Sequence, residues 1–261
     1  KVTCLFLLLD GEQMPRKVIV IGGGAAGLMA AGRAAEVGAN VLLFEKTRRM
    51  GNKLRITGKG RCNLTNNCTV NQFVQRLGPN GMFMRNGFAR FFVDELLAFF
   101  EKLGVPTVTE RGRRVFPASQ KASDVVDALR RYCLDHGVRV RRGARVEGIA
   151  ASDGAARGVT VNNTTVEGAA LVMATGGMSY PSTGSTGDGY EMAKQVGHTV
   201  TPLRPGLVPL VTAEGFVPDL QGLSLRNVQA TLYQDGDELA SEFGEMLFTH
   251  FGVSGPIILT L

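Results

Sequence analysis

Apolar runs and helical patterns alternate through the first 200 residues of the chain. Residues 17–21 and 40–44 are apolar runs of strand length, and residues 25–37 between them have the pattern of a helix. A strand, a helix and a second strand in this order predict a βαβ unit with parallel strands. Apolar side chains at helical spacing in residues 88–100 and 122–133 predict two amphipathic helices that pack on a core.

The middle of the chain predicts shorter elements. Residues 51–67 are rich in Gly, Asn and Thr, which predicts a long loop. A hairpin is expected around Asn162 and Asn163, because β-type runs lie on both sides of this turn. Residues 169–174 form an apolar strand that leads into a glycine-rich stretch. The remaining expected elements are strands at 138–140 and 146–149 and a helix at 190–196.

The pattern changes near residue 205. After Pro202 and Pro205, strand-like runs alternate with polar turns, so we expect residues 14–205 to form one domain and residues 206–261 to begin a second, β-rich one. Met14 is expected to be the natural start, with residues 1–13 as an upstream extension. The chain stops inside an apolar run at Leu261, which predicts that it is a C-terminally shortened piece of a longer protein.

The βαβ unit carries a G-x-G-x-x-G sequence at Gly22, Gly24 and Gly27, and its second strand closes with Glu45. Gly22 permits a tight turn, Gly24 lets the backbone approach a pyrophosphate, and Gly27 lets the helix pack against the strand. Glu45 is placed to accept hydrogen bonds from ribose hydroxyls. The sequence therefore predicts an α/β fold that binds a dinucleotide at a helix N-terminus.

Charge and cysteines narrow the class of protein. The chain has a net charge of +6, and residues 46–93 contain ten Lys or Arg and no Asp or Glu. This surplus indicates either an anionic partner, such as nucleic acid or an acidic substrate, or a solvated basic loop. The four cysteines form no C-x-x-C motif, and we find no export signal and no membrane-spanning run, which favours a reduced, cytoplasmic protein.

A second glycine motif follows the strand at 169–174 and reads Ala174-Thr175-Gly176-Gly177. It resembles the A-T-G motif of flavoproteins that bind two dinucleotides, and it favours FAD over NAD. Residues 51–66, which include Arg61-Cys62-Asn63, resemble the corresponding loop of the BaiN/YhiN-like flavoproteins. Further blocks resemble this NAD(P)/FAD-dependent, aminoacetone-oxidase-like family and extend the resemblance from residue 17 to 256; they lie at 115–119, 174–190 and 248–256.

The resemblance implies a Rossmann-like FAD-binding domain of glutathione-reductase type, with an inserted β-rich domain of which only part is present. Residues of the glycine turn would hold the pyrophosphate, Lys46 and Lys53 would lie beside the phosphates or ribose, and Val146 would contact the adenine through its backbone. The other cofactor-binding residues expected from the fingerprint or the resemblance are Gly22, Gly24, Ala25, Ala26, Gly27, Glu45, Arg61, Cys62, Asn63, Ala174, Thr175 and Gly176.

Three residues are candidates for the chemistry. Cys62 either packs in the interior or lies near the flavin as a proton donor, and its spacing from Cys68 differs from that of disulfide reductases. Tyr180 either faces the flavin ring or anchors a turn. His250 either acts in catalysis or shapes its turn. No cluster of His, Cys and Asp has the spacing of a metal site, so no metal is expected.

The resemblance implies reduction of an activated C=C bond by hydride transfer from the flavin. One branch of the family is associated with bile-acid intermediates and another with uridine in ribosomal RNA, so the substrate is either a small molecule or RNA. The basic stretch makes RNA physically plausible. The electron donor is expected to be transiently bound NAD(P)H or another donor. Besides a reductase of a small molecule and a reductase of RNA, a third hypothesis is that the chain is a non-catalytic fragment with a dinucleotide-binding fold.

Overall fold

The computed structural model describes residues 16–261. The expected upstream extension at 1–13, the expected start at Met14 and the thiol of Cys4 lie outside these residues. The chain divides into two compact units between Val200 and Thr201. Each unit is described by itself below.

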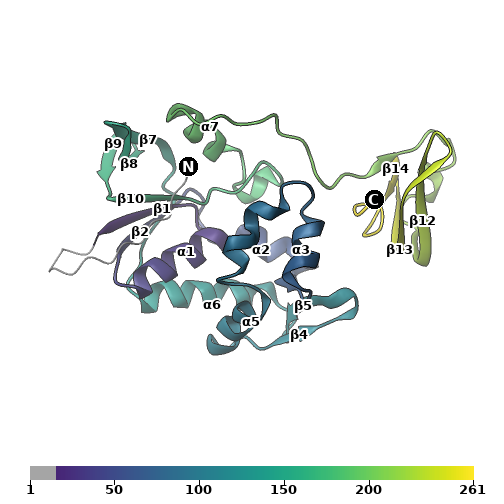
Figure 1. Ribbon diagram of the computed structural model, residues 1–261, viewed down its shortest axis with the longest axis horizontal. Coiled ribbons are helices and arrows are strands. Elements are labelled where there is room, and N and C mark those ends of the chain that lie inside the picture. The colour runs from purple at the N-terminus through teal and green to yellow at the C-terminus, as the bar shows by residue number, and fades with distance from the viewer. Residues whose placement is uncertain (1–15) are drawn as a thin grey trace. The chain divides into compact units, whose positions relative to one another are not determined.

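A four-stranded parallel sheet forms the centre of the first unit (Figure 1). Its strands, in spatial order, are β10 (Ala170–Met173), β1 (Lys17–Ile21), β2 (Asn40–Glu45) and β6 (Arg139–Arg142). The apolar side chains of β1 and β2 are buried on both faces, as expected for parallel strands covered on two sides. The predicted βαβ unit is confirmed.

Two helices lie side by side along one face of this sheet, α1 (Ala25–Glu36) and α6 (Ala122–Asp135) (Figure 1). They approach closely at Gly32, where an added Cβ would meet the Tyr132 ring at 2.3 Å. The Tyr132 hydroxyl donates to the Glu36 carboxylate at 2.7 Å, and both burial and this carboxylate raise its pKa above the ordinary value. The helix predicted at residues 122–133 is thus confirmed.

A three-stranded antiparallel meander lies against the opposite face of the sheet. It consists of β7 (Val146–Ser152), β8 (Ala155–Val161) and β9 (Thr164–Glu167), and its buried side chains join those of β1 and β2 in a second core cluster. Asn162 and Asn163 turn between β8 and β9 with φ of 50° and 58°. Both values suit a type I′ turn, so the predicted hairpin is confirmed.

The segment predicted as a long loop is more structured than the sequence indicated. It contains α2 (Asn52–Ile56), a 3₁₀ turn at Thr57–Gly60 and β3 (Thr65–Asn66), which pairs with β5 (Arg114–Pro117). The expectation of a loop is therefore wrong for most of the segment. Gly51, with a positive φ of 71°, is instead the N-cap of α2.

The Phe-rich segment is also divided where one helix was expected. It forms α4 (Arg85–Phe88) and α5 (Val93–Lys102), with a non-helical backbone at Phe92. The Glu95 carboxylate accepts the Phe92 N–H at 2.9 Å and so fixes the start of α5. The unit also contains α3 (Val70–Arg76), β4 (Thr107–Thr109) and α7 (Asp188–Gln195).

The second unit is an antiparallel sheet, as its strand-like runs predicted. Its order is β11 (Leu210–Val211), β14 (Gly252–Ser254), β13 (Asp237–Thr249) and β12 (Ser224–Gln234). Asp235 and Gly236 form the turn between β12 and β13 with φ of 53° and 93°. That this unit begins an inserted domain stays a prediction.

Candidate functional site

The glycine turn lies at the carboxyl end of β1 and is tightly packed. Gly22 has a φ of 105°, and an added Cβ would stand 2.4 Å from the Ala174 carbonyl oxygen. An added Cβ at Gly27 would stand 1.7 Å from the Gly22 carbonyl oxygen, so α1 can start here only with glycine at this position. The Gly22 N–H donates to the Phe44 carbonyl at 2.8 Å. These contacts fix the turn that leads from β1 into α1.

Gly24 and the first turn of α1 have a different environment. Gly24 is the N-cap of the helix, and among residues 16–261 no atom lies within 4 Å of an added Cβ there. No side chain of the described part of the chain caps this helix end, and its first turn contains no acidic residue. The adjoining Ala25 and Ala26 are exposed. Free N–H groups and the positive end of the helix dipole therefore face an accessible space, which suits an anion.

The Ala174-Thr175-Gly176 segment adjoins the glycine turn from the next strand. The Ala174 N–H donates to the Ile21 carbonyl at 2.8 Å, and Gly176 has a φ of 76° with Ser185 packed against it. From β1 the chain passes through α1 to β2, which pairs with one edge of β1. Strand β10, much later in the sequence, pairs with the other edge. Ligands of open α/β sheets bind at the carboxyl ends of strands where the order reverses in this way.

Glu45 is buried and is fixed by three donors. The Gly23 N–H donates to Oε2 at 2.7 Å, and both the N–H and the hydroxyl of Thr47 donate to Oε1 at 2.7 Å. A carboxylate has about four acceptor positions, so these bonds leave about one for a ribose hydroxyl. The carboxylate thus binds the glycine turn to the segment after β2, a role that the sequence did not indicate.

Lys46 belongs to a charged network at the start of α7. Its Nζ donates to Thr186 Oγ1 at 2.5 Å and to Asp188 Oδ2 at 3.0 Å, while Arg145 contacts the same carboxylate at 3.2 Å. Burial alone would raise the pKa of Asp188, but the hydrogen bonds from Lys46, Thr186 and Arg145 outweigh burial and lower it. Asp188 thereby holds two of the cations near the carboxyl end of β2.

Lys53 and Val146 lie on two further elements of the first unit. Lys53, on α2, donates to Ser179 Oγ at 3.3 Å and so joins α2 to the glycine-rich stretch after β10. Val146 is buried at the start of β7, next to Arg145 of the charged network. A contact of either residue with a cofactor stays a prediction.

Arg61 and Asn63 make their contacts within the protein. The Arg61 guanidinium donates to Glu110 at 2.9 Å and to Gln120 at 2.8 Å, and it stacks 4.0 Å from the centre of the Phe116 ring. When the oxygen and nitrogen of the Asn63 amide are exchanged, as its acceptor neighbours require, the nitrogen donates to the carbonyls of Val115 and Thr65 at 3.1 and 2.9 Å. Both side chains thus hold the segment after α2 against the β5 region.

Cys62 is fully buried, and its backbone has a positive φ of 64°. Burial raises the pKa of its thiol to about 11, so the thiol is protonated at neutral pH. Cys62, Cys68 and Cys133 are free thiols. These facts favour packing over a reactive role for Cys62.

Tyr180 and His250 lie in different units. Tyr180 is 64% exposed, and its αL backbone precedes a 3₁₀ turn at Pro181–Thr183, where its carbonyl accepts the Thr183 hydroxyl at 2.7 Å. His250 is exposed between β13 and β14, with its ring against Phe251. Each residue shapes a turn, and the proposed catalytic roles stay predictions.

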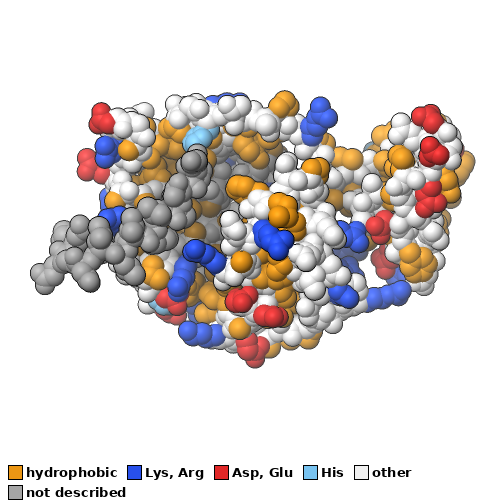
Figure 2. Space-filling model, in the orientation of Figure 1, with side chains coloured by type: hydrophobic (Ala, Val, Ile, Leu, Met, Phe, Trp, Pro, Cys, Tyr) orange, Lys and Arg blue, Asp and Glu red, His pale blue; other side chains and the backbone are white. Residues whose placement is uncertain are grey.

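The basic stretch at residues 46–93 is partly paired with acids from elsewhere in the chain. Lys46 pairs with Asp188, Arg55 with Asp127 and Arg61 with Glu110. On the visible face of the first unit, basic side chains are interspersed with apolar and acidic ones (Figure 2). The surplus of positive charge is therefore smaller than the sequence alone indicated. No helix in residues 16–261 combines the length and apolar character of a membrane span.

Sequence reasoning missed the two residues that organise the polar contacts. Thr47 provides two of the three bonds to Glu45, and Asp188 collects Lys46 and Arg145. Only the position of each residue in the sequence could have drawn attention to it. Thr47 closely follows the acid that ends β2, and Asp188 is the first residue of α7. Their partners are defined only by the folded chain.

The chain matches the family described as HI0933-like protein Rossmann domain over residues 16–254. It is 33% identical over 250 residues to the 3-dehydro-bile acid delta(4,6)-reductase of Clostridium scindens, covering 92% of this chain and 58% of the relative. It is 32% identical over 246 residues to the ribosomal RNA dihydrouridine synthase of Escherichia coli, covering 93% of this chain and 59% of the relative. The chain therefore spans less than two thirds of the length of these relatives.

Solved structures support the same fold. The 3-ketosteroid delta1-dehydrogenase from Sterolibacterium denitrificans, solved with 1,4-androstadiene-3,17-dione, superposes with a TM-score of 0.55 and 14% identity, covering 81% of this chain and 62% of that one. Identity this low shows a common fold alone. The family match implies a flavin cofactor, and together with relatives above 30% identity it shows that this chain belongs to the HI0933-like family of FAD-dependent oxidoreductases.

Proposed function

We propose that this chain binds FAD in the crevice at the carboxyl ends of β1 and β10 and serves an oxidoreductase that reduces an activated C=C bond. The observation that carries the proposal is the convergence of two glycine segments at this point. Gly22 packs on the Ala174 carbonyl, while Gly24 beside them faces open space. A pyrophosphate requires a tightly packed turn, as at Gly22, and free backbone N–H groups beside it, as at the start of α1.

The residues around the crevice fit each part of the cofactor to a different degree. The uncapped start of α1 suits the pyrophosphate, with Gly24, Ala25 and Ala26 closest to it. Glu45 retains about one acceptor position for the adenosine ribose, since its other positions are filled. Lys53 and Ser179 bridge α2 and the segment after β10, and this bond supports the proposal that Lys53 orients another part of the cofactor.

The reaction proposed is reduction of an electron-poor C=C bond. Bound FAD would supply the hydride, as flavins do in such reductions. The curated relatives support this class, since one is a delta(4,6)-reductase of 3-dehydro-bile acids and another forms dihydrouridine in ribosomal RNA. The electron donor is proposed to be transiently bound NAD(P)H or another reductant.

The proton that completes the reduction has one better and one poorer source among the predicted residues. Tyr180 is exposed and belongs to the glycine-rich stretch that follows β10, so a substrate could reach its hydroxyl. Cys62 is fully buried among the described residues, so a substrate does not reach its thiol, and burial raises its pKa to about 11. We therefore favour Tyr180, or water, over Cys62. His250 belongs to the second unit and stays a weaker candidate.

RNA is the second candidate substrate, and charge is the observation that favours it. Residues 46–93 contain ten basic and no acidic side chains, and the acids that pair with some of them come from outside the stretch. Unpaired basic side chains remaining on the surface would contact phosphates without regard to base sequence.

The test is anaerobic reoxidation of the chain loaded with FAD and reduced with dithionite. Separate samples receive a 3-oxo-4-ene steroid, a uridine-containing ribosomal RNA fragment, or a saturated 3-oxo steroid as the control. We expect recovery of the visible flavin absorbance with the enone or the RNA and none with the saturated steroid. If the chain retains FAD but its flavin absorbance recovers with neither the enone nor the RNA, the proposed reduction of a C=C bond is contradicted.

A further inference from the structure

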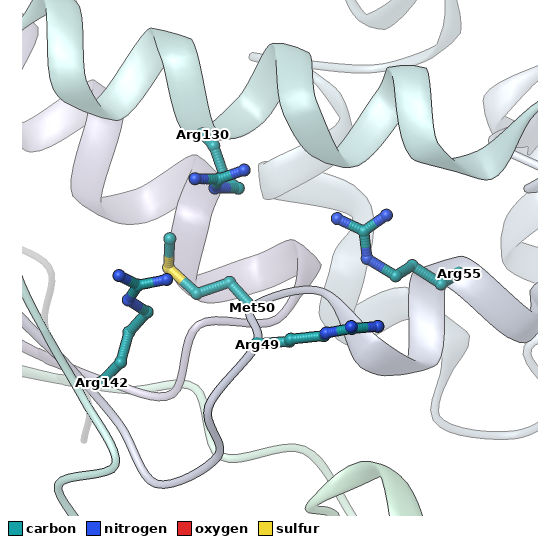
Figure 3. A pocket seen from close by; sticks show the side chains of 5 residues that line it. All are labelled: Arg49, Met50, Arg55, Arg130 and Arg142. Atoms are coloured by element: carbon teal, nitrogen blue, oxygen red, sulfur yellow. The ribbon is translucent and has the colours of Figure 1, made fainter.

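A pocket lined by arginines lies where four parts of the first unit meet. It has a volume of about 230 Å³ and is formed by Arg49 and Met50 after β2, Arg55 on α2, Arg130 on α6 and Arg142 at the end of β6 (Figure 3). None of these residues is among those predicted to bind the flavin. Arg130 and Arg142 also lie outside the basic stretch seen in the sequence.

The pocket contains more positive charge than the protein neutralises. Asp127 contacts Arg130 at 3.1 Å and Arg55 at 3.5 Å, so one carboxylate serves two guanidinium groups. Among residues 16–261, no hydrogen bond or ion pair engages the guanidinium groups of Arg49 and Arg142. Four cations gathered around one carboxylate repel one another, and an anion between them would relieve this repulsion.

Arg55 provides a second, independent sign of a missing partner. Its Nε is buried and has no hydrogen-bond acceptor within the described part of the chain. Buried N–H groups are nearly always paired, because leaving one unpaired forfeits its bond to water without replacement. An anion held among the arginines would offer oxygen acceptors on this side of α2.

The backbone that carries these arginines is held in place. The Thr47 hydroxyl donates to the Arg49 carbonyl at 2.6 Å, and the Gly51 N–H donates to the Gly23 carbonyl at 2.9 Å. An added Cβ at Gly51 would stand 2.8 Å from a methyl group of Val126, so glycine allows α2 to approach α6. The arginines therefore converge without a ligand having to order the backbone first.

We propose that this pocket binds a phosphate group. Guanidinium groups form paired hydrogen bonds with phosphate oxygens, and a phosphate with two negative charges matches the excess of cations better than a single carboxylate does. The volume lies below that of pockets that hold whole drug-sized ligands, which fits one charged group of a larger molecule. That molecule is either a small phosphorylated compound or an RNA strand contacting the pocket through its backbone.

Titration calorimetry with inorganic phosphate tests the site directly in the 261-residue chain. We expect saturable binding that is weakened about tenfold or more in R130Q and in R142Q. R157Q is the matched control, because Arg157 is an exposed residue of β8 paired with Asp153, and its loss changes net charge equally. Circular dichroism verifies that each variant is folded. Because R130Q and R142Q change different elements, one of them still tests the site if the other fails to fold. Absence of saturable binding, or equal weakening in all three variants, overturns the proposal.

Two competition experiments define the ligand and separate this site from the flavin site. Prior saturation with FAD should leave phosphate binding unchanged, and R130Q and R142Q should retain FAD as the parent chain does. Loss of phosphate binding in the FAD-saturated protein would assign the arginines to the cofactor's own phosphates and overturn a separate site. Displacement of phosphate by a short polyuridine RNA would identify backbone phosphate as the source. Retention of phosphate against RNA would identify a small phosphorylated ligand.

Discussion

The glycine turn after β1 and the Arg61-Cys62-Asn63 segment use their polar groups in opposite ways. At the turn, Gly24 and the start of α1 present backbone N–H groups that no side chain caps. In the second segment, Arg61 and Asn63 donate to protein acceptors and Cys62 is buried. Both segments belong to sequence blocks that resemble the family. Two sequence blocks of one family thus differ in what their polar groups do: one leaves them open to a ligand, and the other uses them to hold the fold beside it.

The largest expected effect is at Gly27, and it tests whether the turn is as tightly packed as described. Gly27→Ala places a methyl group against the Gly22 carbonyl and should lower the free energy of unfolding by about 3 kcal/mol or more, measured by urea denaturation. Gly24→Ala is the control, because its methyl group meets no atom of the described residues within 4 Å.

Gly24→Ala should cost less than about 1 kcal/mol of stability but weaken FAD binding about tenfold, since the methyl group occupies the approach to the N–H groups. Equal loss of stability in the two alanine variants would show that the turn does not divide into a packing side and a ligand side.

Glu45→Ala sharpens the same comparison, because this carboxylate serves both purposes. Loss of bonds to Gly23 and Thr47 should lower the free energy of unfolding by about 2–3 kcal/mol. Loss of the bond to ribose should weaken FAD binding by about 1–3 kcal/mol, measured by flavin titration. An unchanged flavin affinity in a folded variant would restrict Glu45 to its structural bonds.

Cys62 allows the architectural role of the second segment to be tested by pH. Its pKa of about 11 in the folded chain lies above the ordinary value of 9.0, so the unfolded chain loses this proton first. Stability from this group is full below pH 9 and is lost as the pH rises toward 11, by about 2 kcal/mol. Urea denaturation of the parent chain and Cys62→Ala should show a difference that shrinks over this range.

Rapid labelling of Cys62 by a thiol reagent at pH 8 would contradict this picture, since a buried, protonated thiol reacts slowly. Cys68 is partly exposed and Cys4 lies outside the described residues, so both are replaced by Ser in the parent chain and in Cys62→Ala to keep their labelling from obscuring the result.

The smallest expected effect is at Asp188, which borders the crevice. Asp188→Asn removes the charge shared by Lys46 and Arg145 and should lower stability by about 1 kcal/mol at neutral pH, since Arg145 is largely exposed and its pair is screened. The pKa of Asp188 is lowered from 3.8 despite burial, so its contribution is present above about pH 4 and is lost in stronger acid. A thermal-unfolding difference that persists unchanged at pH 2 would argue against the ionic network.

The sequence predicted the parts of the fold that depend on near neighbours. Gly22 and Gly27 occur in a short motif between two buried strands, and that motif identifies both the turn and the βαβ unit. Asn162 and Asn163 likewise define their hairpin locally. The sequence did not predict the break at Phe92, because apolar residues keep their helical spacing across it. The Glu95 carboxylate caps α5 by accepting the Phe92 N–H, and this bond leaves no mark on the apolar pattern.

Contacts between distant residues could not be read from the sequence. The bonds from Arg61 to Glu110 and Gln120, which lie on either side of β5, could not be read from the sequence, and the expected contact of Arg61 with the flavin stays a prediction. Arg130 and Arg142 join Arg49 only because α6 and β6 fold beside the segment after β2. A sequence motif names the residues of a region, but long-range packing decides which of them remain available to a ligand.

The most direct test of the account is a visible absorption spectrum of the purified chain, taken after incubation with FAD and desalting. The account predicts flavin bands that survive desalting in the parent chain and are much reduced in Gly24→Ala, while both chains remain folded by circular dichroism. A folded parent chain that emerges colourless would contradict the central claim that the crevice at β1 and β10 binds FAD in this chain.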